Sequence, residues 1–204
     1  MKTIETIKDT KNAKYANLLT KKQTAKWKTL LDVQAPYRWH LRSLKPGYIL
    51  DIGCGIGRNL KHLKGHGVGI DHNLQAIEYV RELGMIAFSP EEFDGSGHDI
   101  PEHFDTLLLA HVVEHMKIDT AVELIKKYIR YLKPTGRLIM ITPQEAGYTS
   151  DSTHVEFIDF AKLQYINKQL NLTMFKEYSF PFPRHVGHLF TYNEFISISI
   201  KANR

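Results

Sequence analysis

The chain has 204 residues, 43% of them hydrophobic and 24% charged, which is typical of one globular α/β domain or two small ones. This composition argues against a disordered, collagen-like or coiled-coil chain, and no apolar run approaches the roughly 18 residues that span a bilayer. The single cysteine, Cys54, excludes an intramolecular disulfide framework and any multi-cysteine metal knuckle. The first residues lack the apolar core of a secretory signal, so we expect a cytoplasmic protein.

The net charge of +5 is unevenly distributed along the chain. Residues 1–45 hold 11 of the 27 Lys and Arg but only 3 of the 22 Asp and Glu, so this segment carries +8 and the rest −3. Such a basic arm can bind RNA, anionic lipid or a phosphorylated substrate. Apolar residues recur among the lysines at roughly helical spacing, however, which favours a solvated helix face over an interaction arm.

Hydrophobic periodicity predicts helices and strands in alternation after a helical start. One or two helices are expected within 3–33, then a turn at 35–39 and a short helix that stops near Pro46. The pattern then predicts strand 48–52, helix 58–63, strand 67–71, helix 74–83, strands 85–88 and 104–110, helix 120–132 and strand 137–142. A breaker turn at 133–136 ends the last of these helices. This alternation is typical of a parallel sheet with helices on both faces.

The final third has a different pattern. A helix over 162–170 precedes two strand-like runs, 172–180 and 189–200, which flank a proline-rich turn. A short turn cannot join parallel strands, so this pair is expected to be antiparallel and to lie at the sheet edge. We expect one domain over 1–204, with a basic helical cap at 1–46, a ligand-binding core at 47–143, and a substrate loop with closing strands at 144–204.

A glycine-rich turn, Asp-Ile-Gly-Cys-Gly-Ile-Gly over 51–57, lies where the first strand meets the first helix, a position where open parallel sheets bind ligands. The dinucleotide fingerprint needs glycine at position 58, where this chain has Arg58, and the phosphate-loop Gly-Lys-Ser/Thr is absent. Asp71 ends the second strand twenty residues after the first acid of the loop. A carboxylate at that spacing can accept two hydrogen bonds from the vicinal hydroxyls of a ribose.

These motifs carry a family resemblance. Residues 48–57 resemble motif I of the class I S-adenosylmethionine-dependent methyltransferases, and residues 104–115 resemble their fourth-strand motif. Residues 132–138 resemble their leucine-lysine-proline-glycine-glycine turn, with Thr135 in place of the first glycine. The resemblance implies an α/β, Rossmann-like, doubly wound and mostly parallel sheet. It also implies S-adenosyl-L-methionine as cofactor and a small-molecule methyl acceptor. Arg184, in Pro-Arg-His over 183–185, would suit an anionic acceptor.

The resemblance also assigns roles at the cofactor. Gly53, Gly55 and Gly57 would wrap the methionyl part, with Asp51 orienting loop amides or the amine through water. Asp71 would hold the ribose. Further cofactor contacts are implied for the cap, the adenine side and the sulfonium side, at Arg38, His72, Ser89, Glu91, Ala110 and His111.

Candidate bases for methyl transfer are His111 and His154, with His115 as a further candidate. Residues 111–115 also spell His-Val-Val-Glu-His, the H-x-x-E-H zinc motif of one metalloprotease class. That motif needs a helix already formed at its first histidine, whereas His111 directly follows a predicted strand. We therefore expect no metal at this motif.

Two other functions stay open. An RNA-directed methyltransferase would bind RNA with the basic arm. Against this, the rest of the chain is acidic and lacks the Asn/Asp-Pro-Pro-aromatic motif of many nucleic-acid methyltransferases. A non-catalytic cofactor-binding protein would explain the lack of an unambiguous base. We expect a small-molecule enzyme, with nucleic acid the less favoured partner and no membrane span. The sequence leaves the acceptor atom and the oligomeric state open.

Overall fold

The structure, a computed structural model, describes residues 34–201. The chain divides into two compact units between Asp99 and Ile100. The helices expected within 3–33 lie outside the described residues. The single-domain organisation stays a prediction, and each unit is described by itself.

The first unit alternates helices and strands in the predicted order. Its elements are α4 (Ala35–Ser43), β1 (Ile49–Ile52), α5 (Arg58–His62), β2 (Gly67–Ile70), α6 (Leu74–Glu82), β3 (Ile86–Phe88) and α7 (Pro90–Phe93). The three strands pair in parallel in the order β3-β2-β1. Every residue of β1 and β2 is buried, which explains why these strands read as apolar runs, broken only by Asp51, rather than as alternating patterns.

The start of the first unit differs from the prediction. A turn was expected at 35–39, but α4 begins at Ala35 with Pro36 in its first turn. Proline has no N–H to lose at that position and its fixed φ suits a helix, so it starts this helix instead of interrupting it. His40 and Leu41 are the buried residues of α4.

Gly57 begins α5 in a left-handed conformation, with φ +74°. A Cβ at this position would also lie 2.8 Å from Cγ2 of the fully buried Val80. Because backbone strain and overpacking add, Gly57→Ala should lower the free energy of unfolding by about 2–4 kcal/mol in urea denaturation. Gly84→Ala is the matched control, since Gly84 has φ +75° and open space around its Cα. It should cost only about 1–2 kcal/mol, and equal losses in the two variants would contradict the packing argument.

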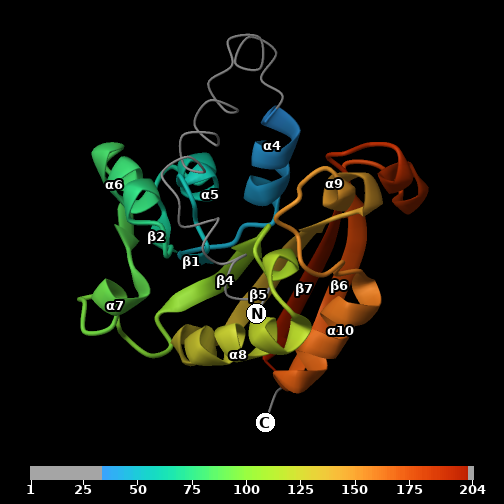
Figure 1. Ribbon diagram of the computed structural model, residues 1–204. Helices are drawn as coiled ribbons and strands as arrows, with labels where there is room; N and C mark the ends of the chain where they lie inside the picture. The colour runs from blue at the N-terminus through green and yellow to red at the C-terminus, as the bar shows by residue number, and fades with distance from the viewer. Residues whose placement is uncertain (1–33, 202–204) are drawn as a thin grey trace. The chain divides into compact units, whose positions relative to one another are not determined.

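The second unit is built on a mixed sheet (Figure 1). Its elements are β4 (Phe104–Ala110), η1 (Val113–His115), α8 (Ile118–Tyr128), η2 (Ile129–Tyr131), β5 (Leu132–Pro143), α9 (Glu145–Thr149), α10 (Phe160–Gln169), β6 (Leu172–Phe180), η3 (Arg184–His188) and β7 (Glu194–Lys201). The strands lie in the order β4-β5-β7-β6. β4 and β5 are parallel, whereas β7 is antiparallel to both β5 and β6. The predicted antiparallel C-terminal pair is therefore confirmed, with β6 outermost in this unit.

The turn expected at 133–136 lies inside β5. Leu132 already pairs with Phe104, and regular pairing resumes only at Arg137 with Thr106. The intervening residues form an irregularity within the strand. The preceding helix α8 ends at Tyr128, earlier than predicted, and the 3₁₀ turn η2 follows it, so the chain is already in the strand where the turn was expected. The last strand is also shorter than expected, since β7 begins only at Glu194 and the connection that follows η3 takes up the start of the predicted run.

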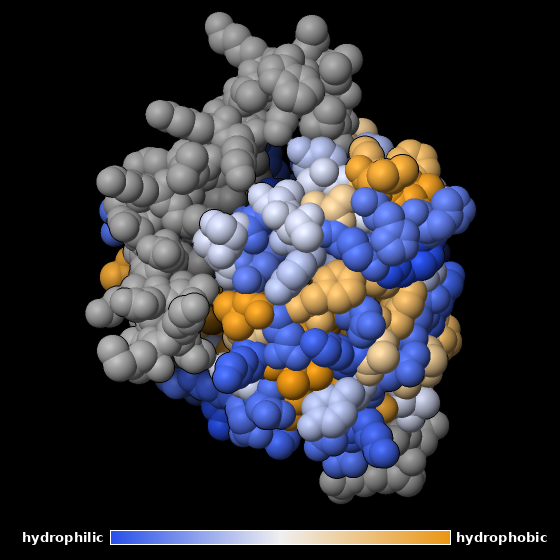
Figure 2. All heavy atoms as spheres, turned by 45° about the vertical axis from the view of Figure 1, so that its right-hand side comes forward, coloured by the Kyte–Doolittle hydropathy of each residue, from blue (hydrophilic) through white to orange (hydrophobic). Residues whose placement is uncertain are grey.

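The surface of the second unit is mixed in character. Its exposed apolar side chains are mostly on β6 and in the loop that follows it, with Phe175 65% and Leu189 90% exposed. Figure 2 shows apolar residues interleaved with hydrophilic ones on the face it presents. Within residues 34–201, no helix combines the length and the apolar character needed to cross a bilayer.

Candidate functional site

The glycine-rich turn closes the carboxyl end of β1. Gly53, Gly55 and Gly57 all have positive φ angles, which most other residues avoid. The N–H groups of Gly53 and Cys54 both donate to the carbonyl of Ile70, at 2.7 and 3.0 Å, and tie the turn to the end of β2. A Cβ on Gly55 would meet no described atom within 4 Å. Glycine at position 55 therefore serves the backbone conformation and leaves open space beside the turn.

Asp71, which directly follows β2, lies against this turn. Its Oδ2 accepts a hydrogen bond from the Gly55 N–H at 2.7 Å, and its Oδ1 accepts one from the Asn73 N–H at 2.8 Å. The side chain is almost fully buried. Because a carboxylate offers about four lone-pair positions, Asp71 is held in place by two donors and keeps capacity for further ones.

Asp51, the third residue of β1, is 1% exposed. Its Oδ1 accepts a weak hydrogen bond from Asn59 Nδ2 at 3.3 Å, and its Oδ2 accepts none from any residue of the described part. Burial raises the pKa of Asp51 to about 7, with a smaller rise from the nearby Asp71 charge. A buried carboxylate with an unpartnered oxygen is suited to receive a cationic donor.

Ser89 and Glu92 form a capping box at α7. The Ser89 Oγ accepts from the Glu92 N–H at 3.1 Å, and Glu92 Oε2 accepts from the Ser89 N–H at 2.8 Å. Glu92 also pairs with Arg81 Nη2 at 2.7 Å. The hydrogen bond from the Ser89 N–H, and to a smaller extent the one from Arg81, lowers the pKa of Glu92. The geometry accounts for Ser89 as a helix cap, so its adenine contact, like that of the exposed Glu91, stays a prediction.

The remaining predicted contacts of the first unit are His72 and Arg38. His72 is 42% exposed and its Nδ1 is 3.8 Å from Asp71 Oδ1. Leu74, 60% exposed, follows at the start of α6 and offers an apolar surface next to Asp71. Arg38 lies half-buried on α4. The structure brings His72 to the Asp71 carboxylate, and the role of Arg38 stays a prediction.

His111 in the second unit follows Ala110 at the end of β4 and has φ +60°, which is uncommon outside glycine. Its Nδ1 lies 3.2 Å from Glu114 Oε1 and its Nε2 lies 2.9 Å from Glu194 Oε1. Burial acts to lower the pKa of His111, but the hydrogen bonds to the two carboxylates outweigh it and raise the pKa to about 10. At neutral pH the ring is therefore protonated, and its two nitrogens donate hydrogen bonds to the carboxylates of Glu114 and Glu194. Its role as a base stays a prediction.

Glu194→Gln should lower the pKa of His111 toward its ordinary 6.5, because one of its two carboxylate partners becomes neutral. The raised pKa means that protonated His111 stabilises the fold below about pH 6.5, and that this contribution is lost as the pH rises through about 10. At pH 8 the free energy of unfolding of the variant should be lower than that of the wild type by about 1 kcal/mol. The expected loss is small because the ring is partly exposed to solvent. NMR titration of the imidazole protons measures the pKa directly. The exposed Glu123→Gln should leave it unchanged, and an unchanged pKa in Glu194→Gln would contradict the pairing.

His115 and His154 lie side by side, with ring centroids 4.8 Å apart. His154 Nδ1 is 2.7 Å from the Tyr148 carbonyl oxygen, and His115 Nδ1 is 3.3 Å from the Thr153 carbonyl oxygen. Since a carbonyl only accepts, each Nδ1 carries the proton and each Nε2 keeps its lone pair. Burial, the largest influence, lowers the pKa of His115. His154, one of the predicted bases, thus has a nitrogen that can accept a proton.

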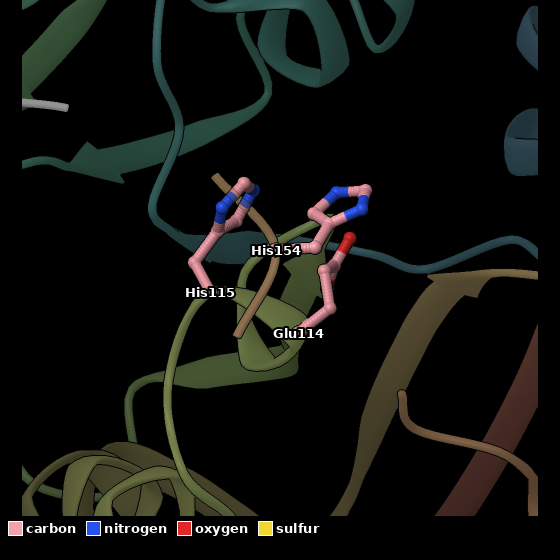
Figure 3. A group of neighbouring side chains, drawn as sticks. All are labelled: Glu114, His115 and His154. Atoms are coloured by element: carbon pink, nitrogen blue, oxygen red, sulfur yellow. The ribbon is translucent and has the colours of Figure 1, made fainter. Parts of the chain in front are cut away.

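Glu114 is fully buried, and its side chain lies near those of His115 and His154 (Figure 3). Its Oε1 faces His111, while its backbone carbonyl accepts from the N–H groups of Val155 and Glu156 at 2.8 and 3.2 Å. These bonds fix the loop that carries His154 against η1. The 3₁₀ helix begins at Val113, after His111, which confirms that the helix required by the H-x-x-E-H zinc motif is not formed at its first histidine.

Several polar residues here were not found from the sequence. Glu194 contacts His111 from 83 positions away. Gln144, fully buried, donates from Nε2 to the Ser179 hydroxyl at 2.9 Å and accepts at Oε1 from Asn193 Nδ2 at 2.9 Å. A polar residue at the end of an apolar strand was the only signal for either. Arg184, suggested by the sequence for an anionic substrate, instead pairs with the Glu145 carboxylate through both Nη atoms.

Comparison with known proteins places these features in context. A family model described as a methyltransferase domain matches residues 19–197. Among curated proteins, the chain is similar to a tRNA U34 carboxymethyltransferase of Hydrogenovibrio crunogenus (strain DSM 25203 / XCL-2), with 33% identity over 115 residues. That alignment covers 50% of this chain and 34% of the relative, so the chain matches about a third of the relative's length.

Solved structures share the fold at low identity. A SAM-dependent methyltransferase from Archaeoglobus fulgidus has a TM-score of 0.64 and 19% identity, covering 92% of this chain and 100% of its own. Magnesium protoporphyrin IX methyltransferase from Synechocystis PCC 6803, with bound SAM, has a TM-score of 0.57 and 13% identity, covering 84% of this chain and 82% of its own. These likenesses confirm the predicted α/β, Rossmann-like fold class.

Proposed function

Because the chain belongs to the methyltransferase-domain family, we propose that it transfers a methyl group from S-adenosyl-L-methionine to a small-molecule acceptor. The family membership makes it an S-adenosylmethionine-dependent methyltransferase. The nature of the acceptor is the proposed part.

The residues of the first unit fit this cofactor. The observation that carries the proposed use of S-adenosylmethionine is the unpartnered Oδ2 of the buried Asp51, at the start of a glycine turn with open space at Gly55. S-adenosylmethionine carries an ammonium group, and an anionic oxygen without a hydrogen-bond donor supplies the acceptor that such a group needs. Asp71, already oriented by two backbone N–H groups, supplies a carboxylate for ribose hydroxyls.

Binding and orientation account for most of what these residues do. When bound, the cofactor supplies a methyl group on a cationic sulfonium, which is open to in-line displacement. Asp51 would accept hydrogen bonds from the ammonium and Asp71 from the ribose, and Asp71 is already oriented by two backbone N–H groups before the ligand arrives. Such preorganisation reduces the entropy lost on binding.

In the second unit, His154 is the residue we propose as proton acceptor. An oxygen nucleophile needs a base, and His154 Nε2 keeps its lone pair while Nδ1 donates to the Tyr148 carbonyl. The Tyr148 ring stacks on the imidazole, with centroids 5.2 Å apart, and limits its rotation. His111, protonated and shared between two carboxylates, provides a fixed positive charge in the same unit.

The test is a transfer experiment with S-adenosylmethionine labelled in the methyl group. The full chain is incubated with a protein-free cell extract, separated beforehand into a small-molecule fraction and total RNA. We expect label in the small-molecule fraction, and none with the Asp71→Ala variant. Label that enters only RNA would overturn the small-molecule acceptor, and no transfer to either fraction would favour a non-catalytic cofactor-binding protein.

RNA is the second candidate acceptor. It is favoured by the similarity to a tRNA carboxymethyltransferase and by the +8 charge of residues 1–45. If tRNA is the acceptor, its affinity should fall steeply between 50 and 200 mM salt, because binding then releases counterions from the phosphates. A filter-binding titration at both salt concentrations distinguishes this from a small-molecule enzyme, for which tRNA binding should be weak at both.

A further inference from the structure

Three side chains of residue types that bind metal ions lie together in the second unit, and one of them, His154, is also the proposed proton acceptor (Figure 3). Glu114 and His115 come from η1, and His154 comes from the loop between α9 and α10. One potential ligand atom from each lies within 4.8 Å of the other two. We propose that Glu114, His115 and His154 bind a divalent transition-metal ion such as Zn²⁺. While the ion is bound, His154 Nε2 is a ligand and does not act as the base, so the metal-bound and the proton-accepting forms of His154 exclude each other.

The Glu114 carboxylate gives the first independent indication of a cation. The side chain is 0% exposed, and its Oε1 is taken by His111. Its Oε2 is buried and has no hydrogen-bond partner within residues 34–201. A buried carboxylate oxygen without a donor is costly, and a metal ion bound to Oε2 would remove that cost.

The two histidines are oriented as metal ligands usually are. His154 donates its Nδ1 proton to the Tyr148 carbonyl, and His115 faces the carbonyl and hydroxyl oxygens of Thr153 with its Nδ1. The Thr153 hydroxyl in turn donates to Asp151 Oδ1 at 2.7 Å. Outer hydrogen bonds of this kind fix the tautomer of a ligating histidine and leave its Nε2 for the metal.

The ligand set selects the class of metal. Two imidazoles and one carboxylate are typical of zinc sites that keep a fourth position open, whereas Mg²⁺ and Ca²⁺ prefer oxygen ligands. Zinc bonds of about 2.0–2.2 Å place ligand atoms roughly 3.3–3.5 Å apart, so binding would draw these side chains together slightly. This set of ligands differs from that of the H-x-x-E-H motif, because His111 is hydrogen-bonded to the Glu114 carboxylate and would not bind the metal ion.

Metal binding to the full chain tests the proposal without cofactor or acceptor, so its outcome is separate from that of the methyl-transfer proposal. After chelator treatment and dialysis, calorimetric titration with ZnCl₂ should show one ion per chain, and Co²⁺ should give the visible absorption of a tetrahedral site. Glu114→Gln and His154→Ala should each weaken Zn²⁺ binding by at least about 100-fold, because each removes a direct ligand. His185→Ala, which alters an exposed histidine of η3, is the matched control and should bind as the wild type does.

Three outcomes would overturn the site: no stoichiometric Zn²⁺ in the wild type, unchanged affinity in both ligand variants, or an equal loss in His185→Ala. Circular dichroism of each variant shows whether it is folded. Should His154→Ala unfold, Glu114→Gln decides the question, because glutamine keeps the shape of the side chain and replaces the anionic Oε2 by a neutral group.

Discussion

Asp51→Asn should make the ligand-free protein more stable at pH 8 while weakening S-adenosylmethionine binding. Burial raises the pKa of Asp51 from 3.8 to about 7, so at pH 8 the folded chain holds an ionised carboxylate without full compensation. Asparagine has the same shape and no charge. At about 1.4 kcal/mol for each pKa unit, the gain in the free energy of unfolding is on the order of 2–4 kcal/mol.

The pH dependence gives this prediction its sign. Because the folded pKa is raised, the stabilising contribution of the protonated Asp51 is complete below pH 3.8 and is lost as the pH rises through about 7. The stability difference between variant and wild type should therefore grow from about pH 4 to pH 7 and then level off. Urea denaturation at several pH values measures it, with the exposed Asp119→Asn as control.

Cofactor affinity should move in the opposite direction in the same variant. The ammonium group of S-adenosylmethionine loses an anionic acceptor, so its dissociation constant should rise by about 10- to 100-fold. A variant that is less stable at pH 8, or one that binds S-adenosylmethionine as well as the wild type, would contradict the role given to Asp51.

Asp71→Ala should weaken S-adenosylmethionine binding by at least about 100-fold. In its proposed role the carboxylate accepts from two ribose hydroxyls, and hydrogen bonds to a charged group contribute about 1.5–3 kcal/mol each. Its loss also frees the N–H groups of Gly55 and Asn73, which Asp71 now orients. Isothermal titration calorimetry of the variant measures the change in the dissociation constant.

Two comparisons separate ligand contact from a collapsed turn. Asp71→Asn retains one oxygen acceptor and should fall between wild type and alanine in affinity, and Asp119→Ala should bind as the wild type does. Thermal unfolding of each variant reports whether the turn still folds. Wild-type affinity in a folded Asp71→Ala protein would refute the assignment of Asp71 to the ribose.

The first unit was largely predictable from the sequence because its signals are local. Buried parallel strands appear as short apolar runs, and the glycines that end β1 are only a few residues from the acid at its centre. The rule that parallel strands end at one edge of a sheet accounts for the contact of Asp71 with Gly55 that the structure shows.

The second unit was predicted less well because its key contacts are distant in sequence. Nothing near His111 indicates that Glu194 will reach it, and nothing near Glu114 indicates that its Oε2 will be buried without a donor. The H-x-x-E-H spacing drew attention to His111 as a possible ligand. Three-dimensional structure was needed to show that His154, from a separate loop, lies beside His115 instead.

Asp51 and Glu114 share one physical feature that links stability to function. Each is buried, and each has one carboxylate oxygen without a hydrogen-bond partner in the described part of the chain. Such groups reduce the stability of the free protein and are retained where a ligand compensates them. In our proposals, the compensating ligands are the cofactor ammonium at Asp51 and a metal ion at Glu114.

The most direct test of cofactor binding is calorimetric titration of the full wild-type chain with S-adenosylmethionine and with S-adenosylhomocysteine. We expect one site per chain with micromolar dissociation constants for both ligands, since both carry the ribose and the amino-acid group. Absence of binding to the folded wild-type protein at millimolar ligand would contradict the assignment of the first unit to this cofactor.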